Sequence, residues 1–397
     1  MLKKFFHRFW QPPRAHGDII EDRTVSFLEL FYDLVYVVVV ATMAHALAHH
    51  LSGAAIVEFV VLFGLVWLAW LNGTLYYDLH GHEDIRTRFF VFAQMAILAF
   101  LAVYIEEAFT GGPGFALAYA AFMTLLMWLW YTVYQVDQRE QIEDAAGMAL
   151  RYILLIGITV VVMIVSAFLP GEIRLIAWGL LVAMWLVGAA VLIWIWSGDE
   201  KRLVMSESTV ERFGLFTILV LGEVVVGVVD GLAESDRSLP AMATAFFALI
   251  IGFGLWWNYF DRAGRNLPRA TSISILWMYL HLPLAMSIAA AGASMISIVE
   301  HATDAHPPAI ATWLLTGAVA LNLLSLAVIG LTLQNYSQMP LVFRPFSFAL
   351  IIAAGASLLV GFWQPGPLVL VLTLAALLAL VWIFLVWRWL VLEDGAE

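Results

Sequence analysis

The chain has 397 residues, of which 63% are hydrophobic and 12% are charged, and its formal net charge is −11. Soluble domains hold about 45–50% apolar and about 25% charged residues, so this composition excludes a soluble globular protein. The acidic balance argues against nucleic acid as a partner. The absence of cysteine excludes disulfides, thiolate metal sites and cysteine nucleophiles.

Residues 1–25 form a polar segment ahead of the first apolar run. Pro12 and Pro13 stand where the apolar core of a signal peptide would be, so no cleavable signal is predicted. The first ten residues mix cations with aromatic side chains, namely Lys3, Lys4, Phe5, Phe6, Arg8, Phe9 and Trp10. This mixture predicts a short amphipathic segment on the cytoplasmic membrane surface, with a disordered tail as the alternative.

Twelve apolar runs follow, each of about 20 residues or more, which is the length that a helix needs to cross a bilayer. They cover 26–48, 55–77, 86–106, 114–136, 148–169, 172–196, 210–231, 240–260, 272–299, 308–333, 342–362 and 367–391. Helix breakers such as Pro170-Gly171 and Pro307-Pro308 lie between the runs. We therefore predict an all-α integral membrane protein with about twelve transmembrane helices.

The positive charges predict how the helices are oriented. With the N-terminus in the cytoplasm, 17 of the 19 Lys and Arg residues fall on the cytoplasmic side, and only Arg174 and Arg237 fall outside. Cytoplasmic loops of membrane proteins carry such an excess of Lys and Arg. Both termini are therefore predicted to be cytoplasmic.

A sequence repeat suggests that the chain is duplicated. Residues 24–35 align without a gap on 209–220, and six of the twelve positions are identical. Tyr77-Asp78 and Phe260-Asp261 extend the match, each at the end of a Trp-rich run. Because each half holds six helices, both halves enter from the same side. We predict two parallel six-helix repeats over 26–197 and 198–392, an architecture found in transporters.

Several polar side chains are predicted at membrane depth, where each needs a partner or a function. Glu29 and Asp33 share one face of the first run. Glu223 is the deepest acid, about 20 Å into the seventh run. The candidate ion or substrate pathway consists of Glu29, Asp33, Gln94, Glu223, Asn258 and His281.

Within this pathway we expect Glu223 to be the central carboxylate and His281 to relay protons or hold Glu223. Charge would be balanced by Asp84, Arg88, Glu211 and Arg212. The alternative is that the acids are protonated, or bonded to neighbouring Arg, Tyr and Trp, and only lock the helices together.

Histidines form a second group. His45 and His49 are spaced as i and i+4 at the outer end of the first run, a spacing at which two histidines can share a metal. A polar helix end is the simpler interpretation, so we predict no metal and no other cofactor. Residues 80–84 are interpreted as a solvated cytoplasmic turn.

The segments with these acids resemble the low temperature requirement A (LtrA) family. The resemblance rests on residues 28–35 followed by His45, on 211–216 leading into 221–223, on Asp84, Arg88 and Gln94-Met95, and on 281–284. It covers about residues 20–390 and implies a multi-pass protein of a bacterial or archaeal inner membrane, linked by the family's name to growth in the cold.

The expected function is movement of a small cation or small solute through the duplicated core, with the lipid bilayer as surroundings. The sequence leaves open whether the protein forms a homo-oligomer. No phosphate-binding loop, nucleophile elbow or zinc-protease signature is present, so an enzyme is less favoured. The alternatives are a membrane enzyme acting on a lipid or lipophilic compound, with the same carboxylates as acid and base, and a cold-stress scaffold without chemistry.

Overall fold

The computed structural model describes residues 9–17, 24–196, 206–264 and 266–393. These residues divide between two compact units. The first unit holds Met1–Met43, Glu58–Val187 and Ser206–Thr209, and the second holds Ala44–Val57, Gly188–Met205 and Val210–Glu397.

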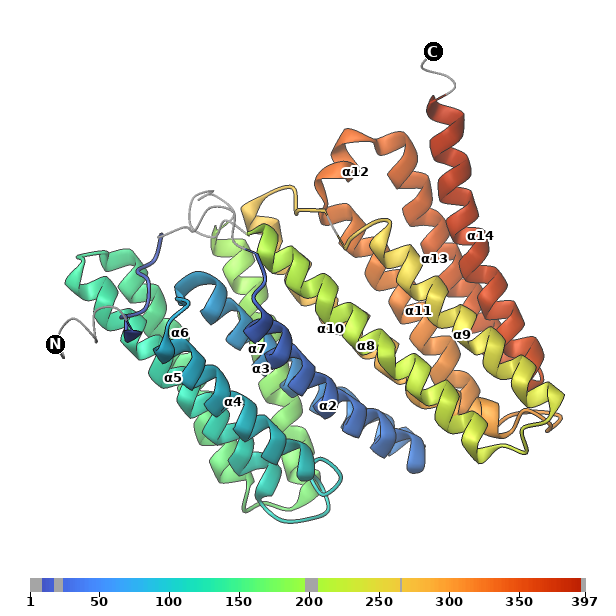
Figure 1. The fold of residues 1–397 in the computed structure, drawn as a ribbon, viewed down its shortest axis with the longest axis horizontal. Coiled ribbons are helices and arrows are strands. Elements are labelled where there is room, and N and C mark those ends of the chain that lie inside the picture. The colour runs from blue at the N-terminus through green and yellow to red at the C-terminus, as the bar shows by residue number, and fades with distance from the viewer. Residues whose placement is uncertain (1–8, 18–23, 197–205, 265, 394–397) are drawn as a thin grey trace. The chain divides into compact units, whose positions relative to one another are not determined.

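The first unit is built mainly from six helices. They are α2 (Phe27–His49), α3 (Gly53–His80), α4 (Ile85–Val103), α5 (Gly114–Arg139), α6 (Glu143–Ser166) and α7 (Gly171–Trp196). In α3, 61% of the most apolar 18-residue stretch is buried, against 28% in α6 and in α7. A helix that is apolar on all sides suits the centre of a bundle, which is the place of α3. Figure 1 shows α4, α5 and α6 side by side.

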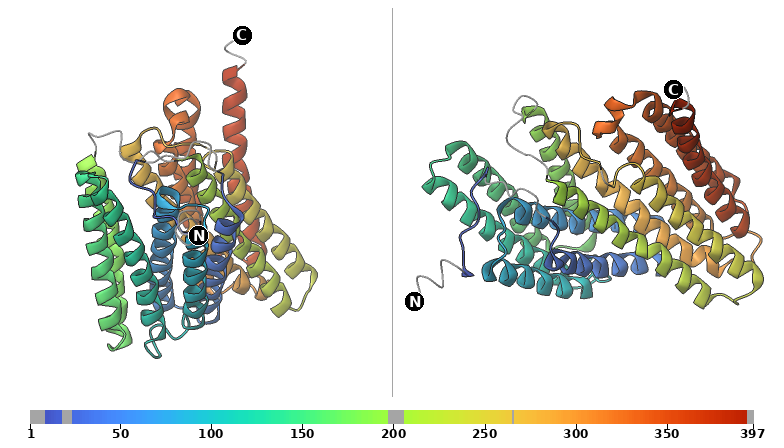
Figure 2. Two further views of the ribbon diagram at one scale, coloured as in Figure 1. Left: turned by 60° about the vertical axis from the view of Figure 1, so that its left-hand side comes forward. Right: turned by 45° about the horizontal axis from the view of Figure 1, so that its top comes forward.

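The second unit contains seven helices among the described residues. They are α8 (Glu207–Glu234), α9 (Leu239–Phe260), α10 (Thr271–Glu300), α11 (Ala309–Thr332), the five-residue α12 (Gln334–Gln338), α13 (Pro340–Trp363) and α14 (Pro367–Glu393). The most apolar stretches of α10 and α11 are 83% and 72% buried, so these two helices form the core. The helices α10 and α11 pack against each other, and α14 packs against α9 and α13 (Figure 2).

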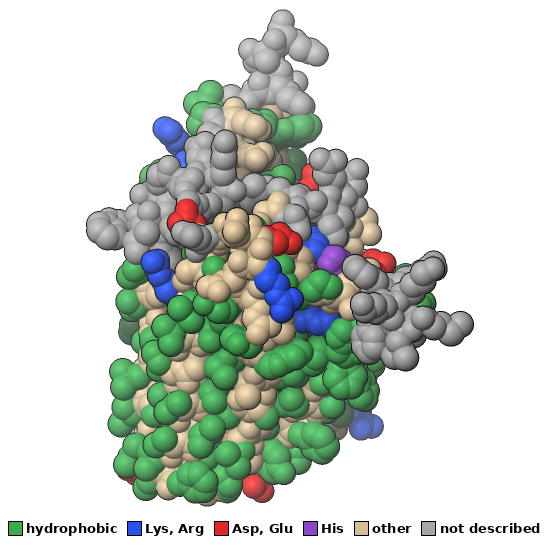
Figure 3. Space-filling view, turned by 90° about the vertical axis from the view of Figure 1, so that its left-hand side faces the viewer, with side chains coloured by type: hydrophobic (Ala, Val, Ile, Leu, Met, Phe, Trp, Pro, Cys, Tyr) green, Lys and Arg blue, Asp and Glu red, His purple; other side chains and the backbone are tan. Residues whose placement is uncertain are grey.

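Twelve of the described helices are long and apolar enough to cross a membrane. Their exposed side chains are apolar too: Val161, on α6, is 60% exposed and Leu180, on α7, is 65% exposed. Figure 3 shows hydrophobic side chains over most of the face drawn, with charged ones mainly toward one end. An apolar exterior of this kind suits contact with lipid. The prediction of an all-helical chain with about twelve transmembrane helices is confirmed, whereas the repeat and the orientation stay predictions.

The helix ends differ from the predicted ones by a few residues. α6 begins at Glu143 rather than 148, and α8 begins at Glu207 rather than 210. The predicted runs counted apolar residues only, but a helix can begin in a polar turn before it reaches the hydrocarbon. The short helix α12 was not predicted, because its five residues carry no periodic pattern.

The N-terminal segment lies in part outside the described residues, which begin at Phe9. Trp10 packs against Phe89 and Phe90, with ring centroids 6.2 and 6.1 Å apart. Arg14 is buried, and its guanidinium donates to the carbonyls of Gly81 and Asp78 at 3.0 and 2.6 Å. The described part of this segment is therefore fixed to the end of α3 and the start of α4.

Candidate functional site

Glu29 lies at the first turn of α2 and is buried. Its Oε2 accepts from the backbone N–H and the hydroxyl of Ser26, both at 3.0 Å, while the Ser26 Oγ accepts from the Glu29 N–H at 3.3 Å. This reciprocal pair is a capping box, which satisfies donors at a helix start. The predicted pathway residue thus has a clear structural task.

Asp33 is fully buried one turn further along α2. The indole Nε1 of Trp70, on α3, donates to its Oδ1 at 2.8 Å. The bond ties α2 to the central helix of the first unit. Glu29 and Asp33 therefore both lie on α2, one turn apart as predicted, and both have hydrogen-bonded partners.

Gln94, on α4, is fully buried and accepts from the hydroxyl of Tyr77, on α3, at 3.0 Å. Its Nε2 has no hydrogen-bond partner among the described residues. A buried amide with one unmet donor is costly, so Gln94 stays a candidate for contact with a polar ligand or water.

Asp84 and Arg88, predicted to balance charge, lie at the start of α4 and have different surroundings. Asp84 is the N-cap of α4: its side chain accepts from the Thr87 N–H at 2.9 Å and from the Gln11 N–H at 2.8 Å. Arg88 is exposed. The buried cation at this place is Arg86, which donates to the hydroxyl of Thr132 at 2.8 Å.

The turn at residues 80–84, predicted to be solvated, is solvated only in part: Glu83 is exposed, whereas the two ends of the turn are buried. His80 and Asp84 are 1% and 7% exposed. The Nδ1 of His80 lies 2.8 Å from the Arg14 carbonyl, and its ring lies 4.5 Å from that of His16. His16 in turn bonds the buried Asp137 through its Nδ1 at 2.6 Å. Sequence reasoning missed this cluster because its members are far apart in the chain.

Asp78 is a second residue whose role could not be read from the sequence. Its carboxylate accepts from the hydroxyls of Ser206 at 3.0 Å, Ser208 at 2.9 Å and Thr209 at 2.6 Å. An acid at a helix start is favourable, since the helix dipole is positive there. Asp261, its counterpart in the predicted repeat, instead accepts from the Trp382 indole at 2.8 Å.

Glu223 lies near the middle of α8, about 24 Å along a helix of about 41 Å. It is only 4% exposed, and its carboxyl has no hydrogen-bond partner among the described residues. Sixteen residues of α8 precede it and eleven follow. The charge that acts on it most directly is a like one, that of Asp230, seven residues further along α8.

Glycines bring α8 and α10 together beside Glu223. A side chain at Gly292 would overlap the backbone of Glu223, and one at Gly227 would overlap the Gly292 carbonyl. Gly231, one turn further, faces Ile296 in the same way. Small residues at a four-residue spacing let membrane helices approach closely. The Glu223 backbone is therefore held firmly against the central helix of its unit.

His281, on α10, is 2% exposed. Its Nδ1 lies 2.8 Å from the Trp277 carbonyl and its Nε2 lies 3.1 Å from the Tyr259 hydroxyl. A carbonyl can only accept, so Nδ1 carries a proton, and in the neutral ring Nε2 accepts from the Tyr259 hydroxyl. Gly292, beside Glu223, is eleven residues or about 16 Å further along α10. The structure does not bring His281 to Glu223.

The other predicted residues of the second unit are dispersed. Asn258 donates from Nδ2 to the carbonyls of Gly254 at 2.8 Å and Leu378 at 3.4 Å, and its Oδ1 is unpartnered among the described residues. Arg212 is buried and Glu211 is exposed. His45 lies 3.3 Å from Asp230, and His49 is exposed. The described residues hold no group of three potential metal ligands.

Arg262, directly after α9, is a buried cation that sequence reasoning did not single out. It is fully buried, donates from Nη2 to the Ser347 hydroxyl at 2.7 Å, and lies 4.5 Å from the ring centroid of Phe346. Burial lowers the pKa of the guanidinium to about 9, which still leaves it charged at neutral pH. Its Nε and Nη1 find no acceptor among the described residues.

Apolar helices of membrane-spanning length, with few polar side chains buried between them, define a multi-pass α-helical membrane protein. The profile of the family described as bacterial low temperature requirement A protein (LtrA) matches residues 24–387. The chain belongs to this family.

A protein of Rhizobium meliloti (strain 1021), described as uncharacterized, is 24% identical over 302 residues, which cover 72% of this chain and 71% of that protein. Its description names neither an activity nor a ligand.

Proposed function

We propose that this protein moves a small cation or small solute across the membrane, and that Glu223 is the carboxylate on which the movement depends. The observation that carries the proposal is the position of Glu223: it is buried at mid-helix and lacks a hydrogen-bonded partner among the described residues. An ionisable side chain at membrane depth is expensive, and such residues are typical of ion and proton pathways.

Comparison with the other acids supports the choice of Glu223. Glu29 serves as a helix cap, and Asp33 accepts from the Trp70 indole. Both therefore have a structural reason to be buried. Glu223 has no comparable reason, so a transported cation or an exchangeable proton would explain its presence.

The close contact between α8 and α10 also supports the proposal. A carboxyl that binds and releases a cation needs a fixed backbone, and Gly227 and Gly292 hold the helix there. His281 and Tyr259 form a separate polar pair on the same central helix and α9. Their contribution would be to position a solute or a water rather than to contact Glu223.

Flux measurements in proteoliposomes test this function. We expect the wild-type protein to pass protons, potassium, sodium or an offered small solute, and Glu223→Gln to lose at least about tenfold of this flux because the amide cannot carry charge. The matched control is Glu234→Gln, an exposed acid at the end of the same helix. It removes the same charge and should transport normally.

Two outcomes would contradict the proposal. Equal flux in wild-type and Glu223→Gln vesicles, at equal protein content, would exclude the role of this carboxyl. Absence of any flux in wild-type vesicles, with protein that is folded and inserted, would favour chemistry on a lipophilic compound or a scaffold instead.

A further inference from the structure

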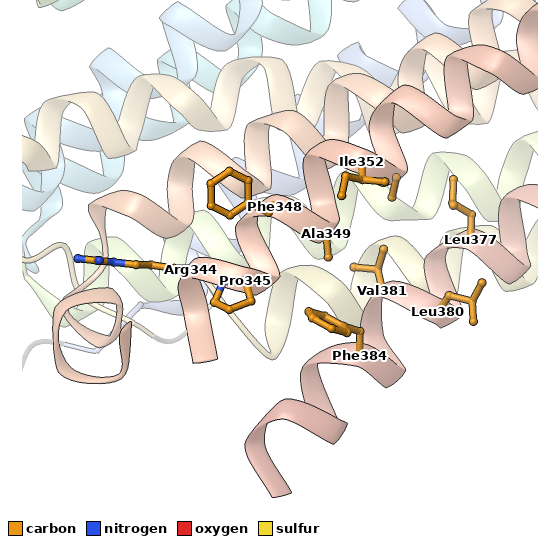
Figure 4. A pocket seen from close by; sticks show the side chains of 10 residues that line it. Arg344, Pro345, Phe348, Ala349, Ile352, Leu377, Leu380, Val381 and Phe384 are labelled. Atoms are coloured by element: carbon orange, nitrogen blue, oxygen red, sulfur yellow. The ribbon is translucent and has the colours of Figure 1, made fainter. Parts of the chain in front are cut away.

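The helices α13 and α14 line an open groove of about 600 Å³, which is within the size range of small-molecule sites, about 300–1,000 Å³. Its floor consists of small or buried side chains such as Ala349 and Val381, and its walls carry Phe348 and Leu380, which are 67% and 62% exposed. Figure 4 shows Arg344 at one end of the row of lining side chains. Every other lining residue is apolar.

A second arginine, Arg388, lies at the same end, where it binds a backbone carbonyl that a proline leaves free. Pro345 lies inside α13, and because it has no N–H it leaves the carbonyl of Leu341 without its usual helical partner. The Nη2 of Arg388, on α14, donates to this carbonyl at 2.8 Å. Arg388 follows the lining residue Phe384 by one helical turn. Two guanidinium groups therefore stand at one end of an apolar groove.

One donor of this pair of arginines has no acceptor among the described residues. The Nε of Arg388 has no hydrogen-bond partner among the described residues. Among the described side chains, Asp261 is an acid of this unit whose carboxylate accepts from the Trp382 indole at 2.8 Å. The buried Arg262 packs on the opposite side of α13, against Phe346 and Ser347, and adds a further positive charge.

We propose that this groove binds a phospholipid with a net negative headgroup, with one acyl chain along Phe348, Ile352 and Leu380 and the phosphate at Arg344 and Arg388. The argument is charge complementarity: the groove is apolar along its length and doubly cationic at one end, which matches an anionic amphiphile. Basic pockets between membrane helices bind such headgroups, and an arginine pairs with phosphate oxygens in a bidentate manner. A zwitterionic lipid would bring its ammonium group toward the two guanidinium groups.

Native mass spectrometry of the purified protein, supplied with equal amounts of phosphatidylglycerol and phosphatidylethanolamine, tests the proposal. We expect phosphatidylglycerol to be retained preferentially, with each arginine contributing about fivefold. Arg344→Gln and Arg388→Gln should each reduce the preference, and Arg344→Lys should keep most of it. Arg151→Gln, an exposed arginine on α6, is the charge control and should change nothing.

A second pair of variants tests the apolar part of the groove. Ala349→Trp would fill the floor and should lower retention of both lipids, whereas Leu359→Trp, on an exposed part of the same helix, should not. Excess inorganic phosphate should not displace the bound lipid. Equal retention of the two lipids by the wild type, or retention unchanged in Ala349→Trp, would overturn the proposal. A mass that reveals a second copy of the chain, lost in Ala349→Trp, would also overturn it.

Discussion

At the scale of single residues, the buried guanidinium of Arg262 packs directly against Gly330. A side chain added at Gly330, on α11, would overlap the Arg262 guanidinium. The absence of a Cβ is what lets the planar group lie against α11 and reach Ser347 and Phe346. The space that the Arg262 guanidinium needs therefore explains why a glycine stands at position 330 of α11.

We predict that Gly330→Ala destabilises the protein by about 1–3 kcal/mol, because the guanidinium must leave its position and lose its partners. Thermal unfolding in detergent, followed by circular dichroism, measures the loss. Gly317→Ala, on the same helix, is the control, since a side chain there meets no atom within 4 Å. Equal melting temperatures for the two variants would contradict this account.

At the scale of helices, the sequence was most informative about the existence and the number of the membrane-spanning helices. Long apolar runs predict spanning helices whatever their neighbours, which is why all twelve were found. The capping box at Ser26 and Glu29 and the four-residue spacing of Gly227 and Gly231 are local patterns too, but the sequence analysis did not use them and interpreted Glu29 as a pathway residue. Contacts such as Asp33 with Trp70, or Asp78 with Ser206, depend on how distant helices meet and leave no local signal.

One such contact joins the start of α7 to the end of α6 and to the connection between α4 and α5. Arg174, on α7, is buried and donates to six backbone carbonyls: those of Ala108, Gly111, Gly112, Ser166, Ala167 and Leu169. Ser166, Ala167 and Leu169 lie at or just after the end of α6, where helical partners run out, and Ala108, Gly111 and Gly112 lie in the connection between α4 and α5. The guanidinium satisfies them in place of water.

We predict that Arg174→Ala lowers the free energy of unfolding by about 2–4 kcal/mol, since several buried carbonyls lose a charged donor at once. Denaturant or thermal unfolding in detergent would measure the change. Arg237→Ala is the matched control, because Arg237 lies in the exposed connection between α8 and α9. If Arg174→Ala lowered the free energy of unfolding no more than Arg237→Ala does, water would replace the guanidinium without loss of stability, and the prediction would be wrong.

At the scale of the whole molecule, the Arg174 contact also bears on the predicted orientation. Arg174 and Arg237 are the two arginines predicted to face the outside, and Arg174 is enclosed by carbonyls. Arg237 is then the one outside arginine with an exposed position among the described residues. The orientation stays a prediction from the bias of the positive charges, because buried arginines occur on both sides.

The absence of cysteine makes this orientation directly testable, because a single introduced thiol is the only one in the chain. We expect Gly112→Cys and Asp236→Cys, in exposed connections predicted to be outside, to react with a membrane-impermeant maleimide on intact cells. Glu83→Cys and Glu140→Cys, in exposed connections predicted to be cytoplasmic, should react only after the membrane is opened. Because Gly112 precedes α5 and Asp236 follows α8, labelling of both from outside requires an even number of crossings between them. Labelling of Glu140→Cys on intact cells would contradict the orientation, and a mismatch between the two outside positions would contradict the predicted parallel halves.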